Sequence, residues 1–161
     1  MTDHIDIHEE EDRYFIFQLG SELCGTPLLG VREVIQPQEI KPVPNTKHYF
    51  VGMINIRGQI IGVIDLRMRY GHPLLSSEHN AFVVFDTPKG TIAAIVDRVD
   101  SVTSIAQTAI DRSKSVITEI SPEYHLGVAH VRNRLVTLLD LNTILAEEVI
   151  ISKNLNKEAR L

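Results

Sequence analysis

Histidines, acidic residues and a single cysteine are the side chains of this chain that could carry out chemistry. Of seven scattered histidines, His4 and His8 have a helical spacing that suits a shared metal ion. They lie in an acidic segment without apolar periodicity, so we expect a solvated tail there and no metal site. Cys24 lies in an apolar segment without a basic neighbour, which favours a buried thiol over a reactive one.

Two aspartates, Asp65 and Asp140, could form an acid and base pair. Each one instead ends an apolar run and precedes a segment with helical spacing, which is typical of a residue that caps a helix. The sequence contains no phosphate-binding glycine loop, no nucleophile elbow and no paired-cysteine metal motif. We therefore expect no catalytic residue, no cofactor and no enzyme activity.

Arg57 is the polar residue whose surroundings best favour a binding role. It stands between apolar Ile56 and Gly58 and follows Asn55. A guanidinium fixed among apolar residues suits a partner or a paired carboxylate, and arginine is enriched at the centres of protein interfaces. The sequence thus predicts that Arg57 binds a protein partner, whereas a solvated side chain is sufficient to account for its counterpart Arg132.

The segment that contains Arg57 occurs twice. Residues 52–67, GMINIRGQIIGVIDLR, match residues 127–142, GVAHVRNRLVTLLDLN, position by position. Each copy predicts a β-hairpin, with a turn at Arg57-Gly58 or at Asn133, because glycine and asparagine tolerate a positive φ. A second related pair, residues 15–34 and 82–99, lies upstream, and each member predicts two further strands and a turn.

These repeats predict an all-β fold of two packed five-stranded barrels. No long amphipathic helix is available to cover an open sheet, so each sheet is expected to close on itself. We place the two units at about 13–75 and 80–150, with a polar linker at 74–80 and a polar loop at 111–123. Residues 1–12 and 151–161 are expected to be flexible tails.

Composition limits the classes of partner. The 161 residues are 43% apolar and 23% charged, as in a globular domain, and the net charge of −5 disfavours nucleic acid. The acidic start lacks the features of a secretory signal, and the apolar run at 60–64 is too short to cross a membrane. We expect a cytoplasmic protein that reaches a membrane only through a partner.

The motifs resemble those of the CheW family of chemotaxis coupling proteins. The resemblance runs from Phe15 to about Val149, and its most specific parts are NIRG at 55–58 and DLR at 65–67. It implies two five-stranded SH3-like barrels and a non-catalytic scaffold that couples chemoreceptor signalling tips to the histidine kinase CheA. It also implies a location at the inner face of the membrane, within receptor arrays. A divergent adaptor of a twitching-type or other non-flagellar system stays open as an alternative.

The resemblance also implies site residues. Those on the kinase side, which would bind the CheA regulatory domain, are Val31, Glu33 and Gly52, and those on the receptor side are Arg57, Ala93, Val99 and Val102. Valines on alternating patterns are often core residues, so ordinary packing is the open alternative for the three valines. Because Glu33 and Arg57 carry opposite charges, our hypothesis is that they pair and fix the shape of a shared binding region, which a mutant cycle would test.

Overall fold

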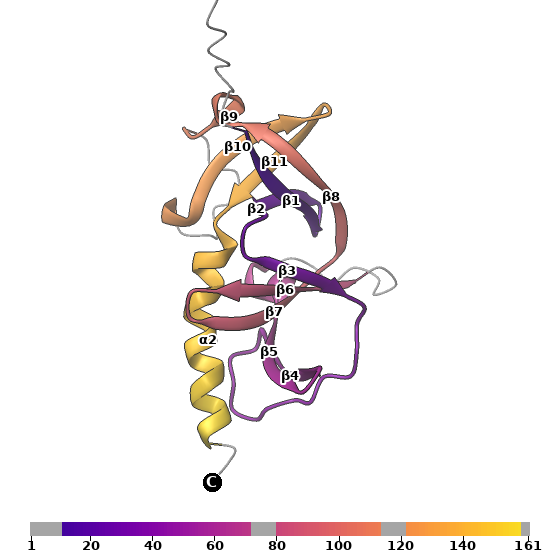
Figure 1. Ribbon diagram of the computed structural model, residues 1–161, viewed down its shortest axis with the longest axis vertical. Coiled ribbons are helices and arrows are strands. Elements are labelled where there is room, and N and C mark those ends of the chain that lie inside the picture. Colours follow the sequence, from indigo (N-terminus) through magenta and orange to yellow (C-terminus); the bar gives the residue numbers. More distant parts are fainter. Residues whose placement is uncertain (1–10, 72–79, 114–121, 159–161) are drawn as a thin grey trace, which may run out of the picture.

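The computed structural model describes residues 11–71, 80–113 and 122–158, and these form two β-sheets with a long C-terminal helix beside them (Figure 1). Most of the described residues are in strands, which confirms the predicted mostly-β fold with two SH3-like units. The predicted linker lies mainly outside the described residues, as does the middle of the predicted loop at 111–123.

One sheet has six strands and the other has five. The six-stranded sheet contains β1 (Glu11–Leu19), β2 (Glu22–Pro27), β8 (Arg98–Ala106), β9 (Ile110–Asp111), β10 (His125–Val131) and β11 (Arg134–Leu139). The five-stranded sheet contains β3 (Val31–Ile35), β4 (Phe50–Ile56), β5 (Gln59–Asp65), β6 (Ala81–Thr87) and β7 (Gly90–Val96). The helices are α1 (Leu66–Arg69) and α2 (Leu141–Glu158), with short 3₁₀ turns η2 (Gln107–Ala109) and η3 (Pro122–Tyr124).

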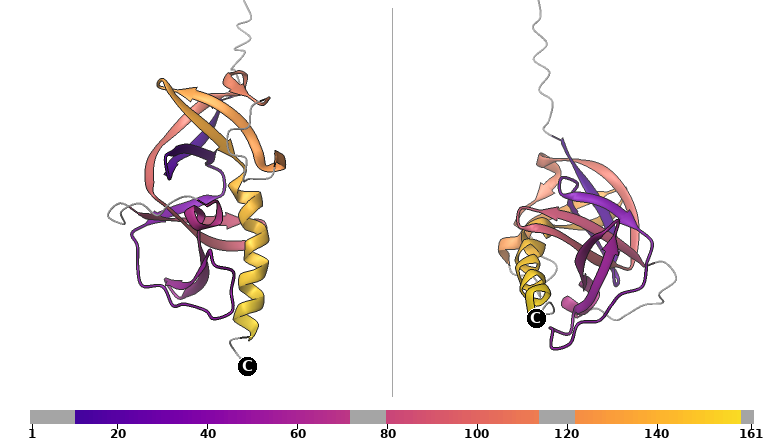
Figure 2. Two further views of the ribbon diagram at one scale, coloured as in Figure 1. Left: turned by 180° about the vertical axis from the view of Figure 1, so that it is seen from behind. Right: turned by 60° about the horizontal axis from the view of Figure 1, so that its bottom comes forward.

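Strand pairing does not follow the consecutive units expected at about 13–75 and 80–150. The strand orders are β8-β1-β2-β11-β10-β9 and β3-β6-β7-β5-β4, so the hairpin β1–β2 belongs with the C-terminal strands. In turn, β6–β7 completes the sheet that β3, β4 and β5 begin (Figure 2). The two halves of the chain therefore exchange their first hairpins. The sequence pattern of a strand indicates which of its faces is buried, but it does not indicate which distant strand pairs with it. The repeat therefore did not predict this exchange.

The two repeated hairpins have the same turn. Arg57 and Gly58 have φ values of 48° and 86°, and Arg132 and Asn133 have values of 51° and 63°. A two-residue turn with positive φ at both positions has the twist that suits a β-hairpin. The predicted turn positions are confirmed, and the arginine of each turn also adopts the left-handed conformation.

The two aspartates cap helices, as predicted. The Asp65 side chain accepts hydrogen bonds from the backbone N–H groups of Arg67 and Met68 at the start of α1. Asp140 accepts from the backbone N–H and the hydroxyl of Thr143 at the start of α2. These contacts satisfy N–H groups that a first helical turn leaves without partners.

Both predicted tails are shorter in the structure. Strand β1 begins at Glu11, and α2 continues to Glu158, so the expected flexible segment at 151–161 is wrong for residues 151–158. Lysine and glutamate in this segment are good helix formers, and a helix already capped and packed can extend through them.

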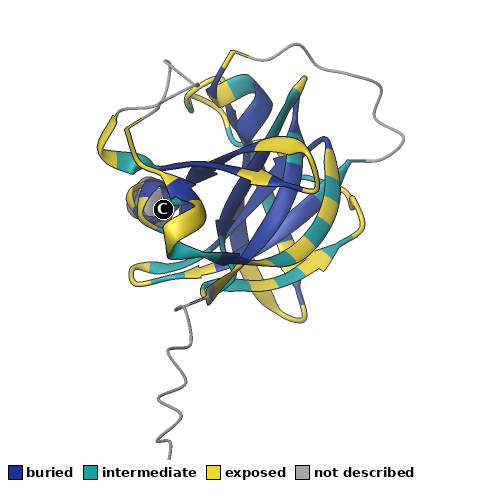
Figure 3. Cartoon of the chain, turned by 90° about the horizontal axis from the view of Figure 1, so that it is seen from above, coloured by how far each residue is buried: buried dark blue, intermediate teal, exposed yellow. Residues whose placement is uncertain are grey.

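The main core lies between the two sheets and α2. Its largest fully buried side chains include Phe17 from β1, Phe85 from β6 and Leu145 from α2. Helix α2 starts beside the six-stranded sheet and runs along the five-stranded one (Figures 1 and 2). Buried residues follow the central strands, and exposed residues gather at the turns (Figure 3). Side chains are therefore available to partners at the turns and at exposed positions of some strands, such as β8.

Candidate functional site

The β4–β5 turn presents an arginine that is paired with a carboxylate. Arg57 Nη2 lies 2.5 Å from Glu33 Oε2 on β3, and 70% of the Arg57 side chain is exposed. The hydrogen bond and charge of Glu33 raise the pKa of Arg57 above its usual value. Asn55 accepts a hydrogen bond from the Gly58 N–H at 2.9 Å, which braces the same turn. The pairing expected from the sequence is present, and it leaves the guanidinium accessible.

Exposed apolar side chains accompany this ion pair. Val34, next to Glu33, is 43% exposed, and Ile60, three residues after Arg57, is 51% exposed. The sequence analysis did not single out either residue, because each lies in an apolar run where burial is the usual expectation. Strands β3 and β5 thus carry exposed apolar side chains as well as an accessible arginine in the turn before β5, a composition typical of protein interfaces.

Gly52 is buried in β4, where there is no room for a side chain. Its φ is 143°, and a Cβ there would collide with the Lys41 carbonyl oxygen. Lys41 and Met53 form a β-bridge at this point, which joins the segment after β3 to β4. Any influence of Gly52 on a partner would therefore pass through the shape of the sheet.

Replacing Gly52 with alanine is expected to lower the free energy of unfolding by about 1–3 kcal/mol, since it adds a steric collision to a strained backbone. Urea denaturation followed by circular dichroism measures this. Gly58→Ala is the matched control, because Gly58 also has a positive φ but has no atom within 4 Å of the Cβ position. Equal losses in the two variants would contradict the collision at Lys41.

Two other predicted site residues differ in accessibility. Ala93 on β7 has an exposed fraction of 0% and lies in the core of the five-stranded sheet with Ile54 and Val84. A receptor cannot touch this side chain, so the expected direct contact at Ala93 gives way to an indirect role in packing. Val31 is half-buried and packs against the main core from the β3 side.

The remaining two predicted residues lie on β8. Val99 lines a pocket of about 360 Å³. The rest of its lining comes from the end of β3 and the residues after it, from the start of β6 and from Arg98: Val34, Ile35, Gln36, Pro37, Asn80, Ala81 and Arg98. Val102, three residues further along the strand, is 43% exposed. The structure thus brings Val99 close to the end of β3, so residues assigned to the receptor side and the neighbours of Glu33 share one surface.

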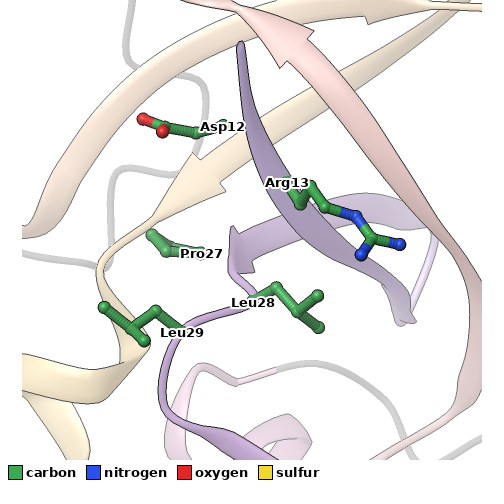
Figure 4. Close-up of a pocket in the computed structure, with 5 residues that line it drawn as sticks. All are labelled: Asp12, Arg13, Pro27, Leu28 and Leu29. Carbon is green, nitrogen blue, oxygen red and sulfur yellow. The ribbon is translucent and has the colours of Figure 1, made fainter. Parts of the chain in front are cut away.

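A second pocket, of about 490 Å³, lies between the start of β1 and the connection from β2 to β3 (Figure 4). Asp12 and Arg13 line it from β1, Pro27 lines it from the end of β2, and Leu28 and Leu29 line it from the connection. The Leu29 side chain is 90% exposed, the most of any large apolar residue with a described side chain. The sequence analysis missed this leucine, because it read the segment as part of a strand.

A buried ion network joins the two sheets close to these surfaces. Arg67 in α1 contacts Asp65 at 2.8 Å and Asp97, between β7 and β8, at 3.2 Å, with all three side chains no more than 8% exposed. Asp97 also accepts a hydrogen bond of 2.6 Å from the backbone N–H of Gly20, in the β1–β2 turn. The network therefore fixes the six-stranded sheet to the five-stranded one. Sequence reasoning recognised Asp65 as a cap and missed its ionic partner.

Cys24 is fully buried in β2, as the sequence predicted. Burial, with a smaller contribution from Glu22, raises the pKa of its thiol to about 12. At pH 8 we expect iodoacetamide to leave the native protein unmodified and to alkylate it in urea, because only the thiolate reacts and the unfolded thiol titrates near its ordinary value. Mass spectrometry measures the two rates, and equal rates would contradict a buried thiol.

The chemistry of the described part of the chain is that of a binding protein. Among the residues it covers, no cluster of three or more histidine, cysteine, aspartate or glutamate side chains could hold a metal ion. No helix within it is both long and apolar enough to span a membrane. The accessible features include an ion-paired turn, exposed apolar residues and shallow pockets, which suit contacts with other proteins.

Comparison with known families gives one match that covers most of the chain. The family model for the CheW-like domain matches residues 13–149. "Chemotaxis protein CheW" of Treponema pallidum (strain Nichols) is 29% identical over 160 residues, covering 96% of this chain and 91% of the relative. The protein of the same name from Helicobacter pylori is 27% identical over 142 residues, with 88% and 86% covered.

Two further similarities concern a solved structure and a shorter stretch of sequence. The crystal structure of the scaffolding protein TtCheW from Thermoanaerobacter tengcongensis superimposes with a TM-score of 0.74 at 28% identity, covering 87% of this chain and 91% of that one. Protein FrzA of Myxococcus xanthus is 32% identical over 56 residues, which is 35% of each chain. The first similarity spans nearly the whole fold, and the second spans a part of it.

Proposed function

This chain belongs to the CheW-like domain family, and from that premise we propose that it links chemoreceptor signalling tips to the histidine kinase CheA. Members of this family act in chemotaxis as scaffolds without a reaction of their own, and the chain acts as such an adaptor. Its partners in this proposal are the regulatory domain of CheA and the cytoplasmic tip of a methyl-accepting receptor.

The observation that carries the proposal is the Glu33–Arg57 ion pair on an exposed turn. An arginine held by a carboxylate loses less conformational freedom on binding than a free one, and it still offers unused N–H donors to a partner. Val34 on β3 and Ile60 on β5 are exposed apolar side chains of the same sheet. This combination favours a specific protein contact over a solvated surface.

We assign the kinase contact to the β3 side, at Val31 and Glu33, with Gly52 preserving the shape of the sheet behind them. The receptor contact is assigned to Arg57, Val99 and Val102. Because Glu33 and Arg57 touch each other, the two assigned regions meet at the ion pair. A change at this pair is therefore expected to alter both contacts.

The proposal places the chain at the inner face of the membrane, where receptor arrays hold many copies together. Contacts of modest strength are adequate there, since avidity over many copies adds to the overall affinity. A non-flagellar chemosensory system is the second candidate pathway. The genes beside this one distinguish the two pathways.

The direct test is binding of the purified chain to two probes, a CheA regulatory domain and a receptor signalling-tip fragment from the same organism. Isothermal titration calorimetry with each probe, followed by a three-component sedimentation assay, is expected to show both binary contacts and a ternary complex. An unrelated β-barrel protein of similar charge serves as the control. Binding to neither probe would contradict the proposed function.

A further inference from the structure

Strand β3 contains a bulge where it faces the β4–β5 turn. Val31 lies opposite Phe85 and Glu33 lies opposite Val84, so Arg32 is an extra residue between two consecutive partners on β6. In a regular strand, neighbouring side chains point to opposite faces, and a bulge redirects one of them. Arg32 and Glu33 consequently both reach the same hairpin, which a regular strand would not allow.

The Arg32 side chain ties several strands to that hairpin. Its Nε and Nη2 atoms lie 2.8 and 2.7 Å from the two carboxylate oxygens of Asp86, at the end of β6. Its Nη1 donates to Gln59 Oε1 at 3.1 Å, and Nη2 donates to the Thr91 hydroxyl at 3.3 Å. The hydrogen bond from Arg32 lowers the pKa of the Asp86 carboxyl. One guanidinium thus connects β3, β6 and β7 with the first residue of β5.

Gln59 directly follows the Arg57-Gly58 turn, so Arg32 and Glu33 hold the turn from its two sides. Glu33 holds the arginine side chain, and Arg32 holds the residue that follows the turn. This matters because 70% of the Arg57 side chain is exposed and only Glu33 restrains its guanidinium among the contacts recorded for the described residues. A turn free to shift would move Arg57 away from any partner surface.

The six-stranded sheet repeats the contact with the charges exchanged. Asp100 is the extra residue of a bulge in β8, since Ile16 lies opposite Ser101 and Phe17 lies opposite Val99. Its carboxylate pairs with both Nη atoms of Arg134, at 2.8 and 2.9 Å, and Arg134 is the first residue after the other hairpin turn. In both sheets, therefore, a bulge residue contacts the first residue after a hairpin turn.

We infer that Arg32 is a positioning residue, which holds the Arg57 turn in its partner-binding geometry through Gln59 and Asp86. The inference rests on the proposed function, because it concerns how the same surface binds. The partner is the one that Arg57 contacts, and Arg32 acts on it through the turn. Sequence reasoning had no access to this role, since the bulge arises from strand pairing.

The test compares Arg32→Ala with Arg57→Ala in titrations against the CheA regulatory domain and the receptor-tip fragment. Arg32→Ala is expected to lower the affinity for the same probe or probes that Arg57→Ala affects, by about five-fold. Asp86→Asn, which leaves Arg32 in place but weakens its carboxylate partner, is expected to act in the same direction. Arg112→Ala is the control, because its exposed guanidinium donates to the Leu126 carbonyl and to Gln107 in the other sheet, and it is expected to leave both affinities unchanged.

A double variant separates positioning from direct contact. If Arg32 acts through the turn, adding Arg32→Ala to the Arg57→Ala variant produces little further loss of affinity. A full additional loss would show that Arg32 touches the partner itself and would overturn the inference. So would unchanged affinities in Arg32→Ala while the wild-type chain binds. If the wild-type chain binds neither probe, the result contradicts the proposed function itself. Circular dichroism of each variant excludes misfolding as the cause of a loss of affinity.

Discussion

Replacing Arg67 with alanine is expected to lower the free energy of unfolding by about 3–5 kcal/mol. Arg67 is buried between Asp65 and Asp97, at 2.8 and 3.2 Å. Removing it would leave two buried carboxylates without a cation, and an uncompensated buried charge is among the most costly changes in a protein. Urea denaturation, monitored by far-ultraviolet circular dichroism, measures the loss.

The control for this prediction is Arg134→Ala, which breaks an ion pair at the surface. The Arg134 side chain is 46% exposed, so water replaces its contacts and the expected change is small. Adding Asp97→Asn to Arg67→Ala is expected to restore part of the lost stability, since it removes one of the two unpaired charges. A stability loss in Arg67→Ala no larger than in Arg134→Ala would contradict a buried network.

Arg57→Ala is expected to weaken partner binding by roughly thirty-fold, the size typical of an interface residue that dominates affinity. The reason is that the guanidinium is 70% exposed and is fixed by Glu33. Calorimetric titration with the receptor-tip fragment and with the CheA regulatory domain measures the change for each partner.

Arg132→Ala is the matched control for Arg57→Ala. Arg132 occupies the same place in the other hairpin turn, with φ of 51° against 48°, and makes no recorded ion pair among the described residues. The charge exchange Glu33→Arg with Arg57→Glu extends the test, because a restored ion pair is expected to recover more affinity than either single change. Additive effects of the two single changes would remove the hypothesis that the pair shapes the surface.

Local features of this fold could be predicted because they depend on neighbours in the chain. The turn at Arg57-Gly58 follows from which residues tolerate a positive φ, and the caps at Asp65 and Asp140 follow from the helical spacing after each one. The Glu33–Arg57 pair joins residues that are distant in the chain; it was expected from their opposite charges once the family resemblance had singled out both, and the structure contains the contact.

Features that depend on distant strands could not be predicted in this way. The exchange of the first hairpins, the bulge at Arg32 and the pairing of Arg67 with Asp97 all require knowledge of which strands lie side by side. The expected receptor contact at Ala93 came from the family resemblance, and the structure instead buries this side chain in a continuous apolar strand.

The exchanged hairpins also affect how the chain folds as it leaves the ribosome. The five-stranded sheet is complete once β7 has emerged at Val96, whereas β1 and β2 await β8 and β11, the last of which ends at Leu139. Until then the N-terminal hairpin has two unpaired edges, which can pair with another nascent chain. Swapping of this hairpin between two copies is the assembly error that such connectivity favours.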